Sequence, residues 1–188
     1  MSLAFTILGK PGNDNSVFIK IDSGQKITRV LLDTGANCLY QLSRNEIAQI
    51  DHICFSHYHM DHICGFDTVF RLLYSKPEPV HFWGPTDTIK VVQSRAMGYT
   101  WNLVHGSRCQ IVVHEIAQNT IRNVKLNLVE GFSIIHEDPP TPFIDNKIFL
   151  DENLEIKGTI LDHKIDCMAY AIAETAKSNF IESEMEKM

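Results

Sequence analysis

The densest group of chemically capable side chains lies at residues 57–62, which read His-Tyr-His-Met-Asp-His. Imidazoles and a carboxylate at this spacing are typical of a transition-metal site, and they suit zinc, with manganese or iron as alternatives. We expect His57 and His59 to point the same way in an extended loop, where both can bind one ion. Asp61 and His62 are better placed for a second ion. Coincidence explains the pattern poorly, at roughly one chance in a thousand for this composition.

The elements around the motif are expected to hold it at the end of a buried strand. Residues 52–55 are predicted to form that strand, and a helix is predicted over 65–74 because Phe66, Phe70 and Leu73 recur at helical spacing. Seven further segments are predicted as strands, together with residues 80–83: 4–8, 16–21, 28–32, 110–114, 124–129, 154–161 and 167–173. The alternation predicts an α/β fold with a layered sheet core flanked by helices.

Three local signals complete this outline. Ser43 followed by Glu46 has the form of a capping box and predicts a short helix that ends near Gln49. Pro85 is expected to open a helix that runs towards Met97. The proline-rich segment 138–142 is predicted to be a loop between strands.

Composition places the chain among ordinary globular proteins and excludes several classes. It has 188 residues, a net charge of −6 and 44% hydrophobic residues, which argues against a disordered chain, a collagen-like repeat or a coiled coil. No apolar run approaches the roughly 18 residues of a membrane-spanning helix. The first residues carry no basic leader, so a cytoplasmic protein is expected. We expect one domain over residues 1–174 and an acidic helical tail over 175–188.

Charge and cysteine content narrow the chemistry further. No lysine or arginine cluster resembles a nucleic-acid patch, so charge alone does not support tight, sequence-independent binding to a phosphate backbone. The five cysteines are an odd number without a C-x-x-C pair, which fits neither a disulfide framework nor a cysteine-rich zinc site. We expect them to be reduced and buried.

The motif at 57–62 resembles that of the metallo-β-lactamase superfamily, which places H-x-H-x-D-H at the end of a central strand. Residues 31–35, Leu-Leu-Asp-Thr-Gly, resemble the strand and Asp-x-Gly element of that family, and Gly65 also fits its pattern. The resemblance implies an αβ/βα sandwich. It also implies a structural role for Asp33, which supports the metal loop from behind, and for Gly35.

Within the superfamily the chain is most similar to the ribonuclease Z family. The segments that carry this resemblance are the Gly-rich turn at residues 8–16, the strand with Trp-Gly-Pro at 81–85 and residues 161–172. The resemblance implies that His163 joins His57 and His59 on the first zinc. Ala169 stands where the family usually has glycine.

This resemblance implies a mechanism and partners. Two zinc ions would share a hydroxide that attacks a phosphodiester, and Asp61 would orient that hydroxide and accept its proton. Lys10, Asn15 and His136 are candidate substrate contacts. The implied substrate is RNA, as in tRNA precursor processing by an endonuclease, and the implied assembly is a homodimer. The family's second half adds a bridging aspartate and a final histidine, which no residue after Tyr170 can replace, so we expect a truncated second half.

Other interpretations stay open at this point. Residues 31–36 also resemble the active-site strand of aspartic proteases, which need two such aspartates. The fold could serve the hydrolysis of a small ester, thioester, lactone or sulfate, or the chain could be an inactive metal-binding homologue. His81, His105 and His114 are expected to be surface or strand histidines and not ligands.

Overall fold

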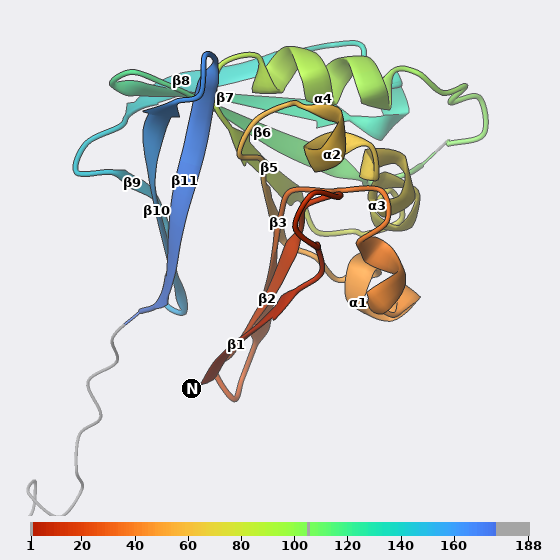
Figure 1. Ribbon diagram of the computed structural model, residues 1–188. Coiled ribbons are helices and arrows are strands. Elements are labelled where there is room, and N and C mark those ends of the chain that lie inside the picture. Colours follow the sequence, from red (N-terminus) through yellow and green to blue (C-terminus); the bar gives the residue numbers. More distant parts are fainter. Residues whose placement is uncertain (1, 105, 176–188) are drawn as a thin grey trace, which may run out of the picture.

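The computed structural model describes residues 2–104 and 106–175, and within these ranges the chain forms two sheets and a set of short helices (Figure 1). The larger sheet has the strand order β1 to β8 and the smaller one the order β11-β10-β9. The larger sheet comprises β1 (Ser2–Ile7), β2 (Val17–Asp22), β3 (Ile27–Leu32), β4 (His52–Cys54), β5 (Val80–Gly84), β6 (Gln110–Ala117), β7 (Thr120–Asn127) and β8 (His136–Pro142). The smaller sheet comprises β9 (Lys147–Leu150), β10 (Leu154–Asp162) and β11 (Asp166–Glu174).

The helices all lie on one face of the larger sheet, and the smaller sheet covers part of the other face (Figure 1). They are α1 (Arg44–Ala48), α2 (Met60–Ile63), α3 (Phe66–Leu73) and α4 (Thr88–Ala96), with 3-10 turns η1 (Leu39–Gln41) and η2 (Leu128–Glu130). Within the described ranges, no helix is long and apolar enough to cross a membrane.

Alternating residues of the central strands build two separate cores. Ile53 and Phe82 pack in the core under the helices, whereas Cys54 and Trp83 pack in the core between the two sheets. Successive side chains of a strand point to opposite faces, so a strand that is covered on both faces is buried at every position. This explains why β4 is buried at all of its positions.

Most predicted elements are confirmed within a residue or two. The capping box is present, since the Ser43 hydroxyl accepts from the Glu46 N–H and the Glu46 carboxylate accepts from the Ser43 N–H. The helix predicted over 65–74 is α3, and all of the strands named above are present. Strand β9 was not predicted, because its four residues give too short a pattern.

Two predictions were wrong in detail. The helix after Pro85 begins only at Thr88, because Asp87 adopts a left-handed backbone conformation (φ 76°). The segment predicted as a proline-rich loop belongs to β8, which lies at the edge of the sheet, where a proline without an N–H is tolerated. Asp61 and His62 lie in the single helical turn α2, an element that was not predicted. Of the predicted tail, residues 176–188 lie outside the described residues.

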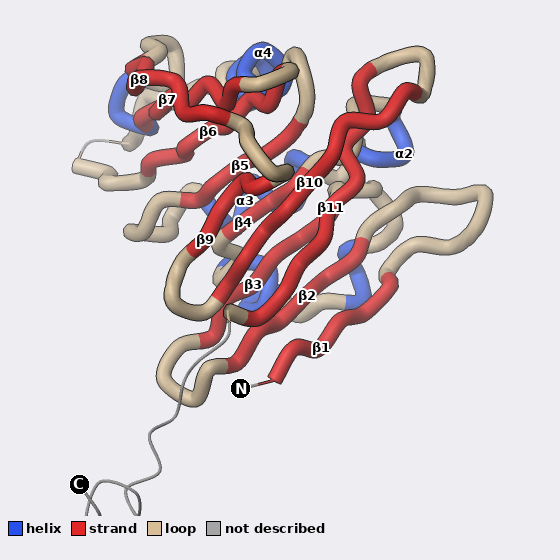
Figure 2. The backbone as a smooth tube through the Cα atoms, turned by 90° about the vertical axis from the view of Figure 1, so that its left-hand side faces the viewer, coloured by secondary structure: helices blue, strands red, loops and turns tan. Residues whose placement is uncertain are grey.

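The topology brings distant segments to one end of the sheet. Strands β3, β4 and β5 are parallel neighbours, so the residues that follow them emerge at the same edge. The loop that joins β10 to β11 reaches the same region, near α2 (Figure 2). Candidate site residues that follow β3, β4 and β10 therefore meet there.

Candidate metal centre

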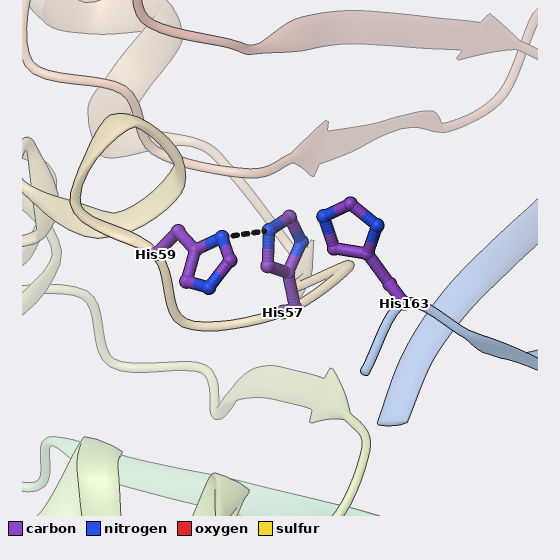
Figure 3. A group of neighbouring side chains, drawn as sticks. All are labelled: His57, His59 and His163. Atoms are coloured by element: carbon purple, nitrogen blue, oxygen red, sulfur yellow. Dashed lines mark hydrogen bonds between the residues drawn. The ribbon is translucent and has the colours of Figure 1, made fainter. Parts of the chain in front are cut away.

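Three histidines from two distant segments converge at this end of the sheet. His57 and His59 follow β4, and His163 lies between β10 and β11 (Figure 3). One nitrogen of each ring lies within 4.8 Å of the others. The Nε2 atom of His57 is 3.0 Å from Nδ1 of His59. The centroids of the His57 and His163 rings are 5.2 Å apart. This is the one such group of metal-ligating side chains among the described residues.

The loop after β4 holds its two histidines differently. His57 is buried, with 5% of its surface exposed, whereas His59 is exposed and forms the N-cap of α2. Burial lowers the pKa of His57, and the neighbouring His62 and His59 act in the same direction. A neutral imidazole has a free lone pair, so these surroundings favour the metal-binding form of His57 near pH 7.

The hairpin that carries His163 is fastened to the loop after β4 at two points. The N–H of Met168 donates to the carbonyl of Ser56 (2.8 Å), and the hydroxyl of Tyr170 donates to the carbonyl of Phe55 (2.8 Å). Both bonds lie in the part of β11 that follows the turn. They set the distance between the hairpin and the strand end from which His57 projects.

Asp61 and His62 form a second pair beside the cluster. Oδ2 of Asp61 lies 3.4 Å from Nε2 of His62. The side-chain amide of Asn15 donates to Oδ2 of Asp61 (3.0 Å) and lies 3.3 Å from Nε2 of His62. A carboxylate and an imidazole therefore face the same point, next to the turn between β1 and β2.

Asp33 follows β3 directly and contacts the loop and helical turn that carry the motif. It is 8% exposed and has a left-handed backbone (φ 55°). Its Oδ1 accepts the N–H of Ser56 (2.7 Å), and its Oδ2 accepts from Nδ1 of His62 (2.7 Å). This hydrogen bond raises the pKa of His62.

The glycines of the site allow close backbone contacts. A Cβ on Gly35 would lie 2.7 Å from the backbone nitrogen of Asn15, and a Cβ on Gly65 would lie 2.7 Å from the carbonyl oxygen of Thr34. The N–H of Thr34 also donates to the carbonyl of His62 (2.7 Å). The loop after β3 thus packs directly on the loop after β4, and side chains larger than hydrogen do not fit between them.

A cavity of about 760 Å³ is lined by His57 and His163 of the cluster and by the neighbouring His62. Of the predicted substrate contacts, Lys10 and Asn15 line it. His136 does not line this cavity, because it lies in β8 and pairs with Glu130 (2.8 Å). The apolar part of the wall consists of side chains from both sheets, including Ile7, Val17, Leu32, Met168 and Tyr170.

Two neighbours of His57 were not anticipated from the sequence. The Ser56 hydroxyl lies 3.0 Å from Nδ1 of His57, and Sγ of Cys167 lies 3.8 Å from the same atom. Cys167 lines the cavity and is only partly buried, contrary to the expectation of buried thiols; Cys64 is also partly buried.

His81 and His114 are strand histidines, as predicted. They lie in β5 and β6, with the His81 Nδ1 and the His114 Nε2 3.0 Å apart. His114 stacks on Trp83 between the two sheets, with ring centroids 3.6 Å apart. His105 lies outside the described residues.

Comparison with known proteins defines the class of this chain. The family described as the beta-lactamase superfamily domain matches residues 28–178. The chain therefore belongs to this superfamily, and its two-sheet fold is the metallo-β-lactamase type predicted from the motif. Membership also excludes the aspartic-protease alternative, and the Asp33 carboxylate is engaged by Ser56 and His62.

The similarity to ribonuclease Z predicted from the sequence is confirmed. The chain is 33% identical over 178 residues to Ribonuclease Z of Deinococcus radiodurans, covering 94% of this chain and 54% of the relative. It is 28% identical over 158 residues to Ribonuclease Z of Clostridium acetobutylicum, covering 81% and 42%. The crystal structure of the short form of human tRNase Z shares the fold (TM-score 0.59, 21% identity), with 90% and 64% covered. The chain spans about half the length of these curated relatives.

Proposed function

We propose that the protein is a metal-dependent hydrolase of phosphodiester bonds, of the ribonuclease Z type, with RNA such as a tRNA precursor as its substrate. The observation that carries this proposal is the convergence of His57, His59 and His163, whose ligand atoms lie within 4.8 Å of one another. Membership of the superfamily and the similarity to two proteins named Ribonuclease Z support it.

The donor set fits a zinc ion. Three neutral imidazoles with room for a fourth ligand are typical of catalytic zinc, and burial favours the neutral form of His57. Asp61 and His62 provide two donors for a second ion. When bound, such ions supply Lewis acidity and lower the pKa of coordinated water towards 7. Manganese and iron also accept these ligands.

The other residues of the site suit a phosphodiester substrate. Lys10 lines the cavity beside the histidines, so its ammonium group is available to bind a phosphate oxygen. Asn15 donates to Oδ2 of Asp61 and so fixes the direction of that carboxylate. We assign Asp61 the role of orienting the attacking water and accepting its proton, and Asp33 the role of holding the loop through His62 and Ser56.

One observation favours a second candidate, a hydrolase of small esters, thioesters, lactones or sulfates. The cavity of about 760 Å³ has the size of a small-ligand site and an apolar wall that includes Val17, Leu32 and Met168. The net charge of −6 also does not favour a polyanionic substrate.

An assay of one zinc-loaded preparation against several substrates tests the proposal. The substrates are a tRNA precursor, bis-p-nitrophenyl phosphate and a thioester. We expect cleavage of the first two, its loss in a His163→Ala variant, and weaker substrate binding in a Lys10→Ala variant. Turnover of the thioester alone would establish the second candidate. No turnover of any substrate by a zinc-loaded full-length protein would identify an inactive homologue.

The homodimer and the cytoplasmic location stay predictions. Size-exclusion chromatography with light scattering tests the first, and fractionation of cells that express the protein tests the second.

A further inference from the structure

The Ser56 hydroxyl occupies a central position behind the metal centre. Its oxygen lies 2.7 Å from Oδ2 of Asp33, 3.0 Å from Nδ1 of His57 and 3.1 Å from Nδ1 of His62. One hydroxyl thus contacts a carboxylate and one histidine from each of the two proposed ligand sets. A role in chain folding alone does not require this arrangement.

Counting donors and acceptors assigns the direction of each bond. A carboxylate only accepts, so the single Ser56 hydrogen points at Oδ2 of Asp33. His62 is closer to that carboxylate (2.7 Å) than to Ser56, so its Nδ1–H also donates to Asp33. The lone pairs of the Ser56 oxygen are then free to accept the Nδ1–H of His57.

This assignment leaves the correct nitrogen of His57 free for a metal. When Nδ1 carries the hydrogen, Nε2 carries the lone pair. Nε2 is the atom that faces His59, at 3.0 Å from its Nδ1. Cys167 is the competing partner of Nδ1, but its sulfur is 3.8 Å away and a thiol is the weaker acceptor.

We propose that Ser56 is a positioning residue that fixes the Nδ1–H tautomer of His57 and links it to Asp33. One carboxylate then orients a histidine of each ligand set, His62 directly and His57 through the Ser56 hydroxyl. This inference rests on the metal centre proposed above. Removal of such a supporting partner typically lowers metal affinity by about 10- to 100-fold.

Ser16 provides a matched control. Its hydroxyl is also buried and also contacts Asp33, but it donates to the backbone carbonyl (2.9 Å), and this bond does not involve a histidine. Ser16→Ala therefore removes a hydroxyl next to Asp33 and leaves the link to His57 in place. Ser56→Ala breaks that link, and Ser56→Thr keeps the hydroxyl.

Two measurements on these variants test the proposal. In the metal-free protein, long-range ¹H–¹⁵N spectra of the imidazoles should show the Nδ1–H tautomer of His57 in the wild type, Ser16→Ala and Ser56→Thr. In Ser56→Ala the Nε2–H form should appear. Competition with a chromophoric chelator should show zinc affinity about 10- to 100-fold lower in Ser56→Ala and close to the wild-type value in the other two.

Other results of these measurements would overturn the proposal or call for a second variant. An unchanged His57 tautomer and unchanged zinc affinity in Ser56→Ala overturn the proposal, and so does an equal loss of affinity in Ser16→Ala. If Ser56→Ala does not fold, Ser56→Cys keeps the volume with a weaker acceptor and should show the same two changes to a smaller degree. If the wild-type protein binds no zinc, the proposed metal centre fails, and the tautomer spectra still decide the role of Ser56.

Discussion

The buried histidine His114 makes the fold sensitive to acid. It lies between the sheets, where its Nδ1–H donates to Oδ1 of Asn123 (2.6 Å) and its Nε2 accepts from Nδ1 of His81 (3.0 Å). Both nitrogens of the neutral ring are therefore satisfied. Added protons would go to Nε2 and break the bond from His81. Burial lowers the pKa of His114 from 6.5 to about 4, although the bond to Asn123 opposes this in part.

The linkage between proton binding and folding gives the sign and size of this pH dependence of stability. A histidine whose pKa is lower in the folded state takes up protons preferentially when unfolded, so stability is complete above pH 6.5 and falls as the pH drops towards 4. For His114 alone the free energy of unfolding should be about 2 kcal/mol lower at pH 5 than at pH 8. Burial also lowers the pKa of His52 and of His81, so both act in the same direction.

Urea unfolding of the metal-free protein at pH 8 and pH 5 measures this effect. We expect His114→Phe, which retains an aromatic ring against Trp83, to lose about 2 kcal/mol less between the two pH values than the wild type. Val113→Ala, a buried and non-titrating neighbour in the same strand, should lower stability at both pH values and keep the wild-type difference. If His114→Phe shows the same difference as the wild type, the neutral buried state of His114 is refuted.

Three further predictions concern the site. Asp33→Asn should lower the pKa of His62 in the metal-free protein, because Asp33 raises it; an NMR titration in which this pKa does not move contradicts the assignment. Gly65→Ala should destabilise the fold by about 1–3 kcal/mol in urea unfolding, because its methyl group would meet the Thr34 carbonyl at 2.7 Å. Gly98→Ala, with a nearest contact of 3.2 Å, should lose less, and equal losses would refute the steric argument. Added zinc should raise the thermal unfolding midpoint, because a ligand that binds the folded state stabilises it by mass action, and a chelator should reverse the rise. If zinc raises the midpoint of His163→Ala as much as that of the wild type, the ligand assignment is contradicted.

Local patterns predicted most of the fold because they act over short distances. The spacing of Phe66, Phe70 and Leu73 defined α3, and Ser43 with Glu46 defined the start of α1. Elements that depend on tertiary context were not predictable in this way. Strand β8 is tolerated despite its prolines because it pairs on one side only, and that is a property of the assembled sheet.

The site was predictable only in part for a similar reason. The motif placed His57 and His59 next to each other, but His163 comes from a hairpin far along the chain, and only the resemblance to a family pointed to it. Ser56 and Cys167 gave no separate signal, since serine and cysteine have many structural roles. The position of Cys167 relative to His57 follows from the packing of β11 against the end of β4. The Ser56 hydroxyl is directed by its contact with the Asp33 carboxylate.

Zinc content tests the central claim most directly. Elemental analysis of purified, zinc-equilibrated protein should show bound zinc in the wild type and in His136→Ala, whose histidine lies in β8 away from the cavity. His57→Ala, His59→Ala and His163→Ala should each lose most of it. Full zinc retention in these three variants would contradict the assignment of the converging histidines as a metal centre.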